Sequence, residues 1–528
     1  MPFASKNPLL DLLHFTEGAR NESTRPWVGI LAVILAAFIS TLSSRLTNFG
    51  VADIGGALGA SFDERAWITT SFSSAQMLMG PLAVWLGLVY GPRRVLLTGT
   101  LLFGFAELLL PMCKGLEGFL LLHFLAGLGS GTFVPLAIGV VVKNLPKHLW
   151  PLGISVYAMN LELSLNIAAT LEGWHLDHGG WQWIFWQNLP LAIALIACVY
   201  FGIPREPIKD DVKGKADYWG MAFAGLGFSL IYAGLDQGNR LDWGASGLVV
   251  GLLLGGGSLV GAFIVHGLRH PQPFINFRFL LARNIVPLLL LLVTARLLVL
   301  SSNFIVPQFL TQVAGFRPQQ VGEVLLWVAL PQFLIGPCVG VILRYVDARI
   351  LMSIGMTLIL SACLLASRLT SLWSESDFIP SMLMQAIGQT MVLTSLIFYT
   401  VRHLNPVLVL TFGAIIQTAR LLGGELASAL VQSYARVSTQ IHSNLLGVHV
   451  VAGESSLIER LSGLTHGALS RFGSADPLNG GRAAAVLAGQ IRAQAQTLAY
   501  ADTFLLAAAT AVIGLLLIAT LRPPPPSP

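Results

Sequence analysis

The stretch WVGILAVILAAFISTLSS, residues 27–44, is long and apolar enough to form a membrane-spanning helix. Such a helix needs about 20 apolar residues, because it crosses roughly 30 Å of hydrocarbon with every backbone polar group hydrogen-bonded internally. Thirteen similar stretches follow, so the sequence predicts an all-α membrane protein with 14 transmembrane helices. Their predicted starts lie near Trp27, Ala66, Val95, Phe119, Pro151, Trp183, Tyr218, Ser246, Ile285, Val321, Ile350, Phe378, Val407 and Thr503.

The basic residues between these stretches fall mostly in alternate gaps. Arg93, Lys143 and Arg205 lie in the richer set of gaps, whereas the opposite short gaps hold single cations such as Arg65. Short loops rich in Lys and Arg stay on the cytoplasmic side of a membrane. We therefore expect a multi-pass protein of the inner (plasma) membrane with both chain ends in the cytoplasm.

The composition supports this class of protein. Hydrophobic residues make up 54% of the chain and charged residues 11%, against about 25% charged residues in soluble domains. The net charge of +5 follows from the loop orientation and does not indicate nucleic-acid binding. The four cysteines lack metal-ligand spacing, so we expect neither a metal site nor a disulfide framework.

The sequence contains no Walker motif and no catalytic motif of the G-x-S-x-G, H-E-x-x-H or CxxC type. We therefore expect a protein that is not an enzyme and needs no cofactor. The proton gradient is the expected energy source in place of ATP.

A weak internal repeat suggests that the chain has two halves. Tyr90-Gly91-Pro92-Arg93-Arg94 follows the second stretch and Tyr345-Val346-Asp347-Ala348-Arg349 follows the tenth. Either these basic turns mark two bundles around a midplane site, or two cytoplasmic turns are alike by chance. The predicted parts are a cytoplasmic segment 1–26, an N-terminal six-helix bundle 27–203, a cytoplasmic linker 204–217, an inserted helix pair with its connector 218–283, a C-terminal six-helix bundle 284–522 and a Pro-rich tail 523–528.

One outer gap is much longer than the others. Residues 436–500 combine a capping-box spacing at Ser456 and Glu459 with leucines at helical intervals, and a strong turn signal follows at residues 475–481. The pattern predicts a periplasmic helical hairpin within the C-terminal bundle. The hairpin either serves as a solvated connector or forms a docking surface or gate.

Several motifs resemble those of fourteen-span drug:proton antiporters of the major facilitator superfamily, the EmrB/QacA type. The most specific is the run from Gly180 to Pro190, which is similar to the W-x-W-I-F-x-x-N-x-P signature that opens the sixth span. The resemblance implies two six-helix bundles with two inserted helices. It also implies export of drugs, and a periplasmic adaptor protein with an outer-membrane channel as partners. The other similar segments are Trp67–Ser71, Leu235–Gly238, Asp242–Trp243, His270–Phe274 and Arg420–Gly424.

The chain departs from the family pattern at positions that bear on mechanism. Where the first span of the family reads L-D-x-T-I-x-N, this chain has Ser43 in place of the acidic residue. In the fourth span, His123 replaces the arginine of Arg-x-x-Gln-Gly. The antiporter motif of the fifth span is reduced to Asn166–Gly173. These differences make proton coupling less secure than the fold.

Ionisable residues inside the apolar stretches are the candidate site residues. The free energy of inserting such a side chain at the centre of a span is unfavourable by about 2.5–3.5 kcal/mol, so each one needs a partner, a water cavity or a function. Glu162 and Glu425 are candidate proton carriers, since a carboxylate in an apolar cavity can exchange protons near neutral pH. His123 is a third candidate because imidazole titrates near neutral pH. The alternative for each is a structural salt bridge or hydrogen bond.

The cations and amides near them are candidate cavity residues. Arg45 either binds an anionic group of the substrate or forms a salt bridge to Glu162 or Glu425. The remaining members of this set are Asn48, Asn166, Arg296 and Arg420, and the basic turns add Arg93, Arg94, Asp347 and Arg349 as candidate conformational residues.

The combined expectation is a secondary transporter that exports drugs or other small organic compounds in exchange for protons by alternating access. Its bundles would rock around a midplane cavity, in contact with membrane lipid and without nucleic acid. A proton-independent or sodium-coupled carrier, or a non-transporting membrane receptor, is the alternative.

Overall fold

The computed structural model describes residues 26–144, 150–210, 217–271, 273, 275, 285–403, 409–448, 450, 455–472 and 479–522. A few helical side chains inside these ranges, Glu162 among them, are not described. All regular structure in the described part is helical, as the sequence predicts. The helices of the first half are α2 (Pro26–Phe49), α3 (Val51–Ala57), α4 (Phe62–Tyr90), α5 (Pro92–Leu109), α6 (Leu116–Ser130), α7 (Phe133–Asn144), α8 (Trp150–His178), α9 (Trp183–Trp186) and α10 (Asn188–Gly202).

The remaining helices are longer on average. They are α12 (Tyr218–Gly238), α13 (Gly247–Arg269), α15 (Ile285–Leu300), α16 (Val306–Gln312), α17 (Pro318–Ile342), α18 (Ala348–Ala366), α19 (Glu375–His403), α20 (Val409–Val448), α21 (Ser455–Phe472) and α22 (Asn479–Thr520). Short turns of 3-10 helix lie at Leu110–Met112 and Trp243–Ala245, and a π-helical segment, η4, covers Ser301–Ile305.

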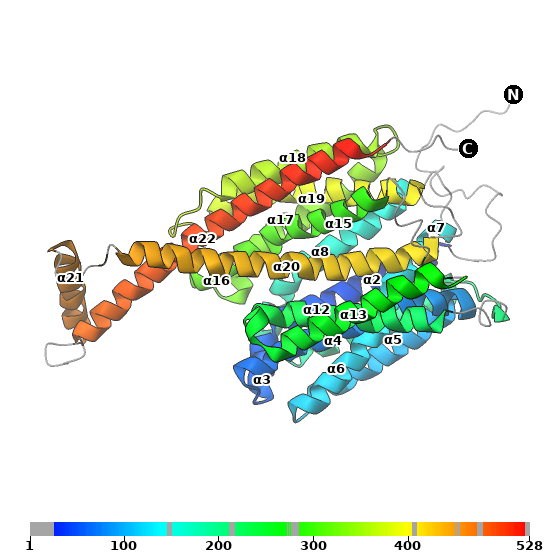
Figure 1. Ribbon diagram of the computed structural model, residues 1–528, viewed down its shortest axis with the longest axis horizontal. Helices are drawn as coiled ribbons and strands as arrows, with labels where there is room; N and C mark the ends of the chain where they lie inside the picture. Colours follow the sequence, from blue (N-terminus) through cyan, green and yellow to red (C-terminus); the bar gives the residue numbers. More distant parts are fainter. Residues whose placement is uncertain are drawn as a thin grey trace.

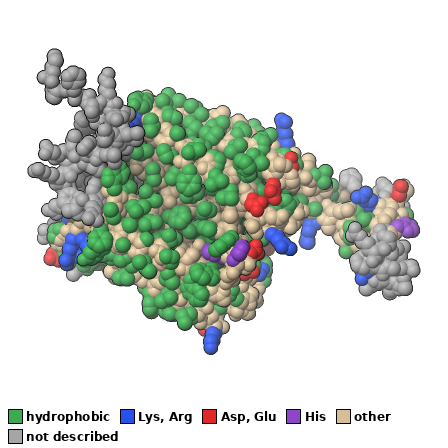
Figure 2. Space-filling view, turned by 180° about the vertical axis from the view of Figure 1, so that it is seen from behind, with side chains coloured by type: hydrophobic (Ala, Val, Ile, Leu, Met, Phe, Trp, Pro, Cys, Tyr) green, Lys and Arg blue, Asp and Glu red, His purple; other side chains and the backbone are tan. Residues whose placement is uncertain are grey.

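In the described part, 13 helical segments are long and apolar enough to span a membrane. The predicted span near Val407 corresponds to α20, which is less apolar because it carries Gln417, Arg420 and Glu425. Figure 2 shows hydrophobic side chains over the face between the two ends of the molecule, with charged side chains gathered toward the ends. The chain is therefore a multi-pass membrane protein.

The two ends of the molecule differ. Helices α3 and α21 lie at one end, which we call the hairpin end, and α22 stops near Leu521 at the opposite end, which we call the terminus end (Figure 1). In Figure 1, helices α2 to α6 lie on one side together with α12 and α13, helices α15, α17, α18, α19 and α22 lie on the other, and α8 and α20 run between them. Helix α8 packs against α17 along this seam, and α12 packs against α13, α4 and α20.

Two of the predicted spans are interrupted. The fourth consists of α6 and α7, which meet at Gly131 and Thr132, and the ninth consists of α15, η4 and α16. A Cβ atom at Gly127 would lie 2.4 Å from the carbonyl oxygen of Phe72, so this glycine of the fourth span permits close contact between α6 and α4. At Gly257 and Gly261 of α13, by contrast, no described atom outside the local backbone lies within 4 Å of a Cβ.

Within residues 436–500 the structure has two outer helical segments, α21 and the first part of α22, which pack against each other. Helix α20 continues to Val448 and α22 begins at Asn479, so both are extensions of membrane-spanning helices, and α21 lies across their ends (Figure 1). The extensions are joined through Asp502, whose Oδ2 accepts a hydrogen bond from Ser438 Oγ at 2.7 Å and lies 2.7 Å from His442 Nε2. Leu457, Leu461 and Leu464 of α21 are half-buried.

Candidate functional site in the central cavity

A polar cavity lies between the two sides of the molecule. Its volume is about 420 Å³, and its walls come from α2, α4, α12, α15, α16, α17 and α20. Toward the hairpin end it reaches the exposed residues Thr311 and Gln312. A second cavity of about 400 Å³ shares Gln308, Gln312 and Gln432 with the first and continues to Gln440. The two cavities form a polar path toward the hairpin end.

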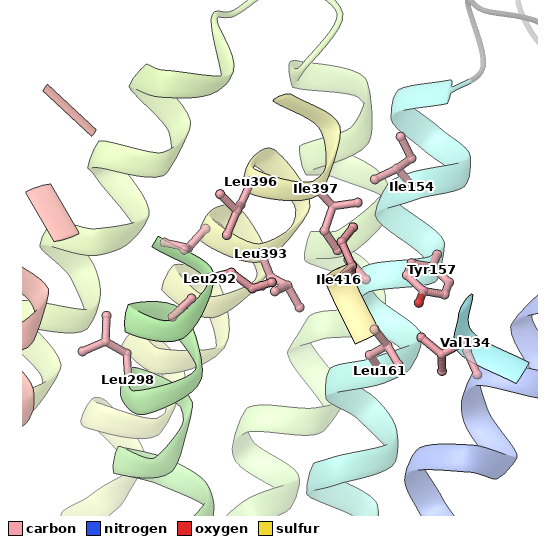
Figure 3. Close-up of a cluster of buried hydrophobic side chains, with 14 of the residues drawn as sticks. Val134, Ile154, Tyr157, Leu161, Leu292, Leu298, Leu393, Leu396, Ile397 and Ile416 are labelled. Atoms are coloured by element: carbon pink, nitrogen blue, oxygen red, sulfur yellow. The ribbon is translucent and has the colours of Figure 1, made fainter. Parts of the chain in front are cut away.

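Apolar side chains fill the seam toward the terminus end. Tyr157 and Leu161 of α8 lie close to Ile397 of α19 and Ile416 of α20 (Figure 3). Only a small cavity, of about 30 Å³, lies among these side chains. Because α8 belongs to the first half of the chain and α19 and α20 belong to the second, the two sides of the molecule meet here. The cavity is thus accessible from the hairpin end and sealed by packing toward the other.

Arginines lie at the boundary between the polar cavity and this apolar cluster. Arg296 and Arg420 line both the large and the small cavity, and Arg45 lines the large one. The guanidinium of Arg420 donates to Gln417 Oε1 from Nε at 3.2 Å and from Nη2 at 3.0 Å. Arg296 lies against Gly424, where a Cβ atom would be 3.6 Å from its Nε. The cavity is therefore lined by cationic side chains.

Two carboxylates lie in the wall formed by α12 and α20. Glu425 of α20 and Asp236 of α12 both line the cavity and are close enough for their charges to interact. Tyr232, one turn before Asp236, lies within hydrogen-bonding reach of Glu425 and of Ser73. Thr70 Oγ1 donates a hydrogen bond to Asp236 Oδ2. We did not predict Asp236 or Tyr232 as site residues, although an Asp in an apolar helix is a detectable signal.

The π-helical segment η4 adds an uncharged polar group to the site. Asn303 is 4% exposed and lines the cavity, and its Oδ1 and Nδ2 have no hydrogen-bond partner among the described residues. The neighbouring Ser301 and Ser302 accept hydrogen bonds from Gln385 at 2.7 Å and Gln389 at 2.9 Å. These contacts fix η4 against α19. Short π-helical segments are frequent at functional sites. The amide of Asn303 is thus available to a ligand.

The structure separates the predicted site residues into two groups. Arg45, Asn48, Arg296, Arg420 and Glu425 line the cavity. Asn166 and His123 are buried and are not among the described residues that line it. The side chain of Glu162 lies outside the described residues.

His123 lies within the N-terminal half of the molecule. Its Nδ1 is 3.0 Å from the carbonyl oxygen of Ile68, and its ring stacks on Phe72 with 4.8 Å between centroids. The rings of Phe119 and Phe185 also contact it. Its Nε2 lies 3.5 Å from Thr47 Oγ1 of α2. This environment fits the hydrogen-bonded alternative for His123.

The signature motif of the sixth span has a structural role near the hairpin end. Asn188 Nδ2 donates to Glu107 Oε2 at 3.0 Å, and Ser43 Oγ donates to Glu107 Oε1 at 3.2 Å. Glu107 is fully buried. Because these residues belong to α2, α5 and α10, the carboxylate ties three helices together.

The basic turns also form local structure. Arg94 Nη1 donates to the carbonyl oxygen of Tyr90 at 3.0 Å, and Arg93 stacks over the ring of Tyr200. Asp347 forms a 2.8 Å salt bridge with Arg349, which lowers the pKa of Asp347 and keeps the pair charged at neutral pH. Arg349 Nη1 also donates to the carbonyl oxygen of Leu521 at 3.1 Å, so this turn anchors the end of α22.

Comparisons with known proteins agree with this architecture. The model of the Major Facilitator Superfamily matches residues 33–428. The multidrug export protein EmrB of Haemophilus influenzae is 25% identical over 94% of this chain and 95% of its own length. The fatty acid resistance protein FarB of Neisseria gonorrhoeae is 23% identical over 84% of this chain and 87% of its own.

A solved structure supports the same fold. The human organic anion transporter MFSD10 (TETRAN) superposes with a TM-score of 0.55 at 14% identity, over 92% of this chain and 99% of its own. At this identity the likeness concerns the fold alone. Because the family model covers most of the chain and the helices are arranged around one central cavity, the chain belongs to the Major Facilitator Superfamily.

Proposed function

We propose that the chain is an inner-membrane transporter, not an enzyme, that exports drugs or other organic compounds in exchange for protons. The observation that carries the proposal is the polar cavity between the two sides of the molecule, accessible from the hairpin end and sealed by apolar packing toward the terminus end. Similarity along nearly the whole length of a multidrug export protein supports export as the direction.

The proposal includes 14 membrane-spanning helices, with α20 as the thirteenth and α12–α13 as the inserted pair. Both chain ends then lie in the cytoplasm, as the distribution of loop charges predicts. The hairpin end is accordingly periplasmic, and the conformation is the outward-facing one. Alternating access requires the apolar cluster around Tyr157 and Ile416 to separate in the inward-facing state.

The coupling step follows from the charges in the cavity. Arg45 is an electrostatic neighbour of Glu425, so movement of α2 relative to α20 changes the proton affinity of that carboxylate. In the outward-facing state the cavity exchanges protons with the periplasm and releases its substrate. After the switch, the proton leaves to the cytoplasm and the next substrate enters.

The lining also suggests the chemical class of the substrate. Guanidinium groups bind carboxylates with two parallel hydrogen bonds, and Asn303 offers an amide donor and acceptor. Apolar residues such as Leu300, Phe304 and Leu421 complete the wall. We infer that amphipathic compounds with an anionic or zwitterionic group fit the cavity best.

Flux measurements in proteoliposomes test the proposed function. A pH gradient should drive accumulation of substrate by the wild type. The double variant Glu425→Gln with Glu162→Gln should lose this pH-driven accumulation, because glutamine has the shape of glutamate but cannot bind and release a proton. Normal pH-driven flux in the double variant contradicts proton carriage at these residues. Flux that follows a sodium gradient or needs no gradient identifies the alternative carriers, and no flux under any gradient identifies a receptor.

A periplasmic adaptor protein, continuing to an outer-membrane channel, is the proposed partner at the hairpin end. Helix α21 is the element that offers a surface beyond the bundle there (Figure 1). We expect replacement of residues 455–472 by a Gly/Ser linker of equal length to abolish drug resistance in cells while purified protein still transports. Loss of both activities indicates a gate, and survival of both indicates a passive connector, so either result contradicts the adaptor.

A further inference from the structure

The inserted helix α12 contributes an acidic residue to the central cavity. Asp236 is the one acidic residue of α12, and it lies where the helix meets both α4 and α20. Thr70 of α4 donates to its carboxylate and in turn accepts a hydrogen bond from Gln237 Nε2 at 2.6 Å. A further contact, from Ser229 Oγ to the carbonyl oxygen of Ser74 at 2.9 Å, joins the same two helices. Asp236 is thus fixed to the side of the molecule that contains α4.

Its neighbour Glu425 belongs to the other side. Glu425 is 9% exposed, and α20 packs against α15 and α22 of the C-terminal half as well as against α12. Tyr232 connects the two carboxylates, because it lies one turn from Asp236 and within hydrogen-bonding reach of Glu425. The two acids therefore belong to different sides of the molecule, line the same cavity and are electrostatic neighbours of each other.

We propose that Asp236 and Glu425 form a single proton-binding site that holds one shared proton in the outward-facing state. This inference rests on the proposed proton-coupled function. Two neighbouring carboxylates in a largely buried cavity wall do not both ionise readily, so they retain one proton between them. The proton is bonded to an oxygen of one carboxyl group while the other carboxylate stays ionised, and it leaves to cavity water when the pair separates.

The surrounding charges allow such a pair to release its proton. Arg45 of α2 faces Glu425, Arg296 of α15 lies against Gly424, and Arg420 lies on α20 itself. Arg240, two residues beyond the end of α12, is an electrostatic neighbour of Asp236, and it donates hydrogen bonds to Gln237 Oε1 at 2.7 Å and to Asp63. These cations favour the ionised acids, and the mutual repulsion of the acids favours the shared proton. A shift of either helix changes the balance.

Separation of the pair gives the inserted helices a role in coupling. If α12 moves with α4 while α20 moves with the C-terminal half, the distance between the carboxylates changes with every transport cycle. Proton affinity is then set by conformation, which is the requirement for coupled exchange. The missing acidic residue of the first span, where the chain has Ser43, is replaced in this account by Asp236.

The test compares two transport modes in proteoliposomes. Asp236→Asn should lower accumulation driven by a pH gradient at least ~10-fold, while exchange of labelled for unlabelled substrate at equal pH stays within about twofold. Asp236→Glu should restore the pH-driven mode. The matched control is Asp242→Asn, since Asp242 follows the same helix, pairs with Arg436 at 3.1 Å and is not itself among the described residues that line either cavity.

Each outcome is decisive. Wild-type pH dependence in Asp236→Asn overturns the shared site and leaves the proposed function intact. Equal loss of both transport modes, with no rescue by glutamate, assigns Asp236 a structural role and also overturns the shared site. Absence of pH-driven transport in the wild type itself overturns the proposed function, and the inference fails with it.

Discussion

Replacement of Gly413 by leucine is expected to stop efflux by preventing closure of the terminus end. A Cβ atom at position 413 of α20 would lie 2.3 Å from the carbonyl oxygen of Pro135 in α7. A backbone carbonyl cannot rotate away as a side chain can, so the two helices must separate. Overpacking of this kind costs about 1–3 kcal/mol, which corresponds to a shift of roughly 5- to 150-fold away from the outward-facing state.

Cysteine accessibility reports this shift. In a background without Cys113, Cys198, Cys338 and Cys363, a cysteine at Ile397 should become reactive to a membrane-impermeant maleimide applied from the terminus side. The matched control is Gly447→Leu on the same helix, where a Cβ atom would have no other atom within 4 Å. Unchanged reactivity and normal efflux in Gly413→Leu would show that α7 and α20 do not form the seal.

Removal of the guanidinium at Arg45 is expected to reduce transport about as strongly as Gly413→Leu does, but only for anionic substrates. Arg45→Ala should lower transport of an organic acid at least ~10-fold, and Arg45→Lys should recover only part of it, because lysine cannot form two parallel hydrogen bonds to a carboxylate. Transport of a quaternary ammonium compound should change much less. Arg368→Ala, at an exposed position on the hairpin end, is the control.

The measurement is initial uptake of both compounds by each variant in proteoliposomes. Size-exclusion profiles and melting temperatures check that Arg45→Ala still folds, since Arg45 is also an electrostatic neighbour of Glu425. If the wild type transports only the quaternary ammonium compound, and Arg45→Lys transports it equally well, Arg45 does not bind substrate.

The membrane-spanning helices could be predicted because hydrophobic length is a property of the local sequence. The interruption at Ser301–Ile305 could not, because it depends on contacts from Gln385 and Gln389 about 85 positions away in the chain. The continuity of the outer segment with the membrane-spanning helices α20 and α22 was also not predicted. Long runs of helix-forming residues around Arg436 and Tyr500 let α20 and α22 continue, and no local signal showed that these extensions would join through Asp502.

The site was predictable where a charge lies inside an apolar stretch. That criterion found Arg45, Arg296, Arg420 and Glu425, all of which line the cavity. It does not tell which way a helix face points, so His123 was included although it packs among aromatic rings away from the cavity. Asn303 was missed because an uncharged amide in an apolar stretch gives a weak signal.

In the proposed mechanism, substrate and proton compete in one outward-facing cavity. This competition can be measured by adding substrate to purified protein in weakly buffered detergent and recording the protons released. We expect the wild type to release protons on binding over part of the range from about pH 5 to 8, and Asp236→Asn with Glu425→Gln to bind substrate without release. Binding by the wild type with no proton release at any pH in this range would show that substrate and proton do not compete.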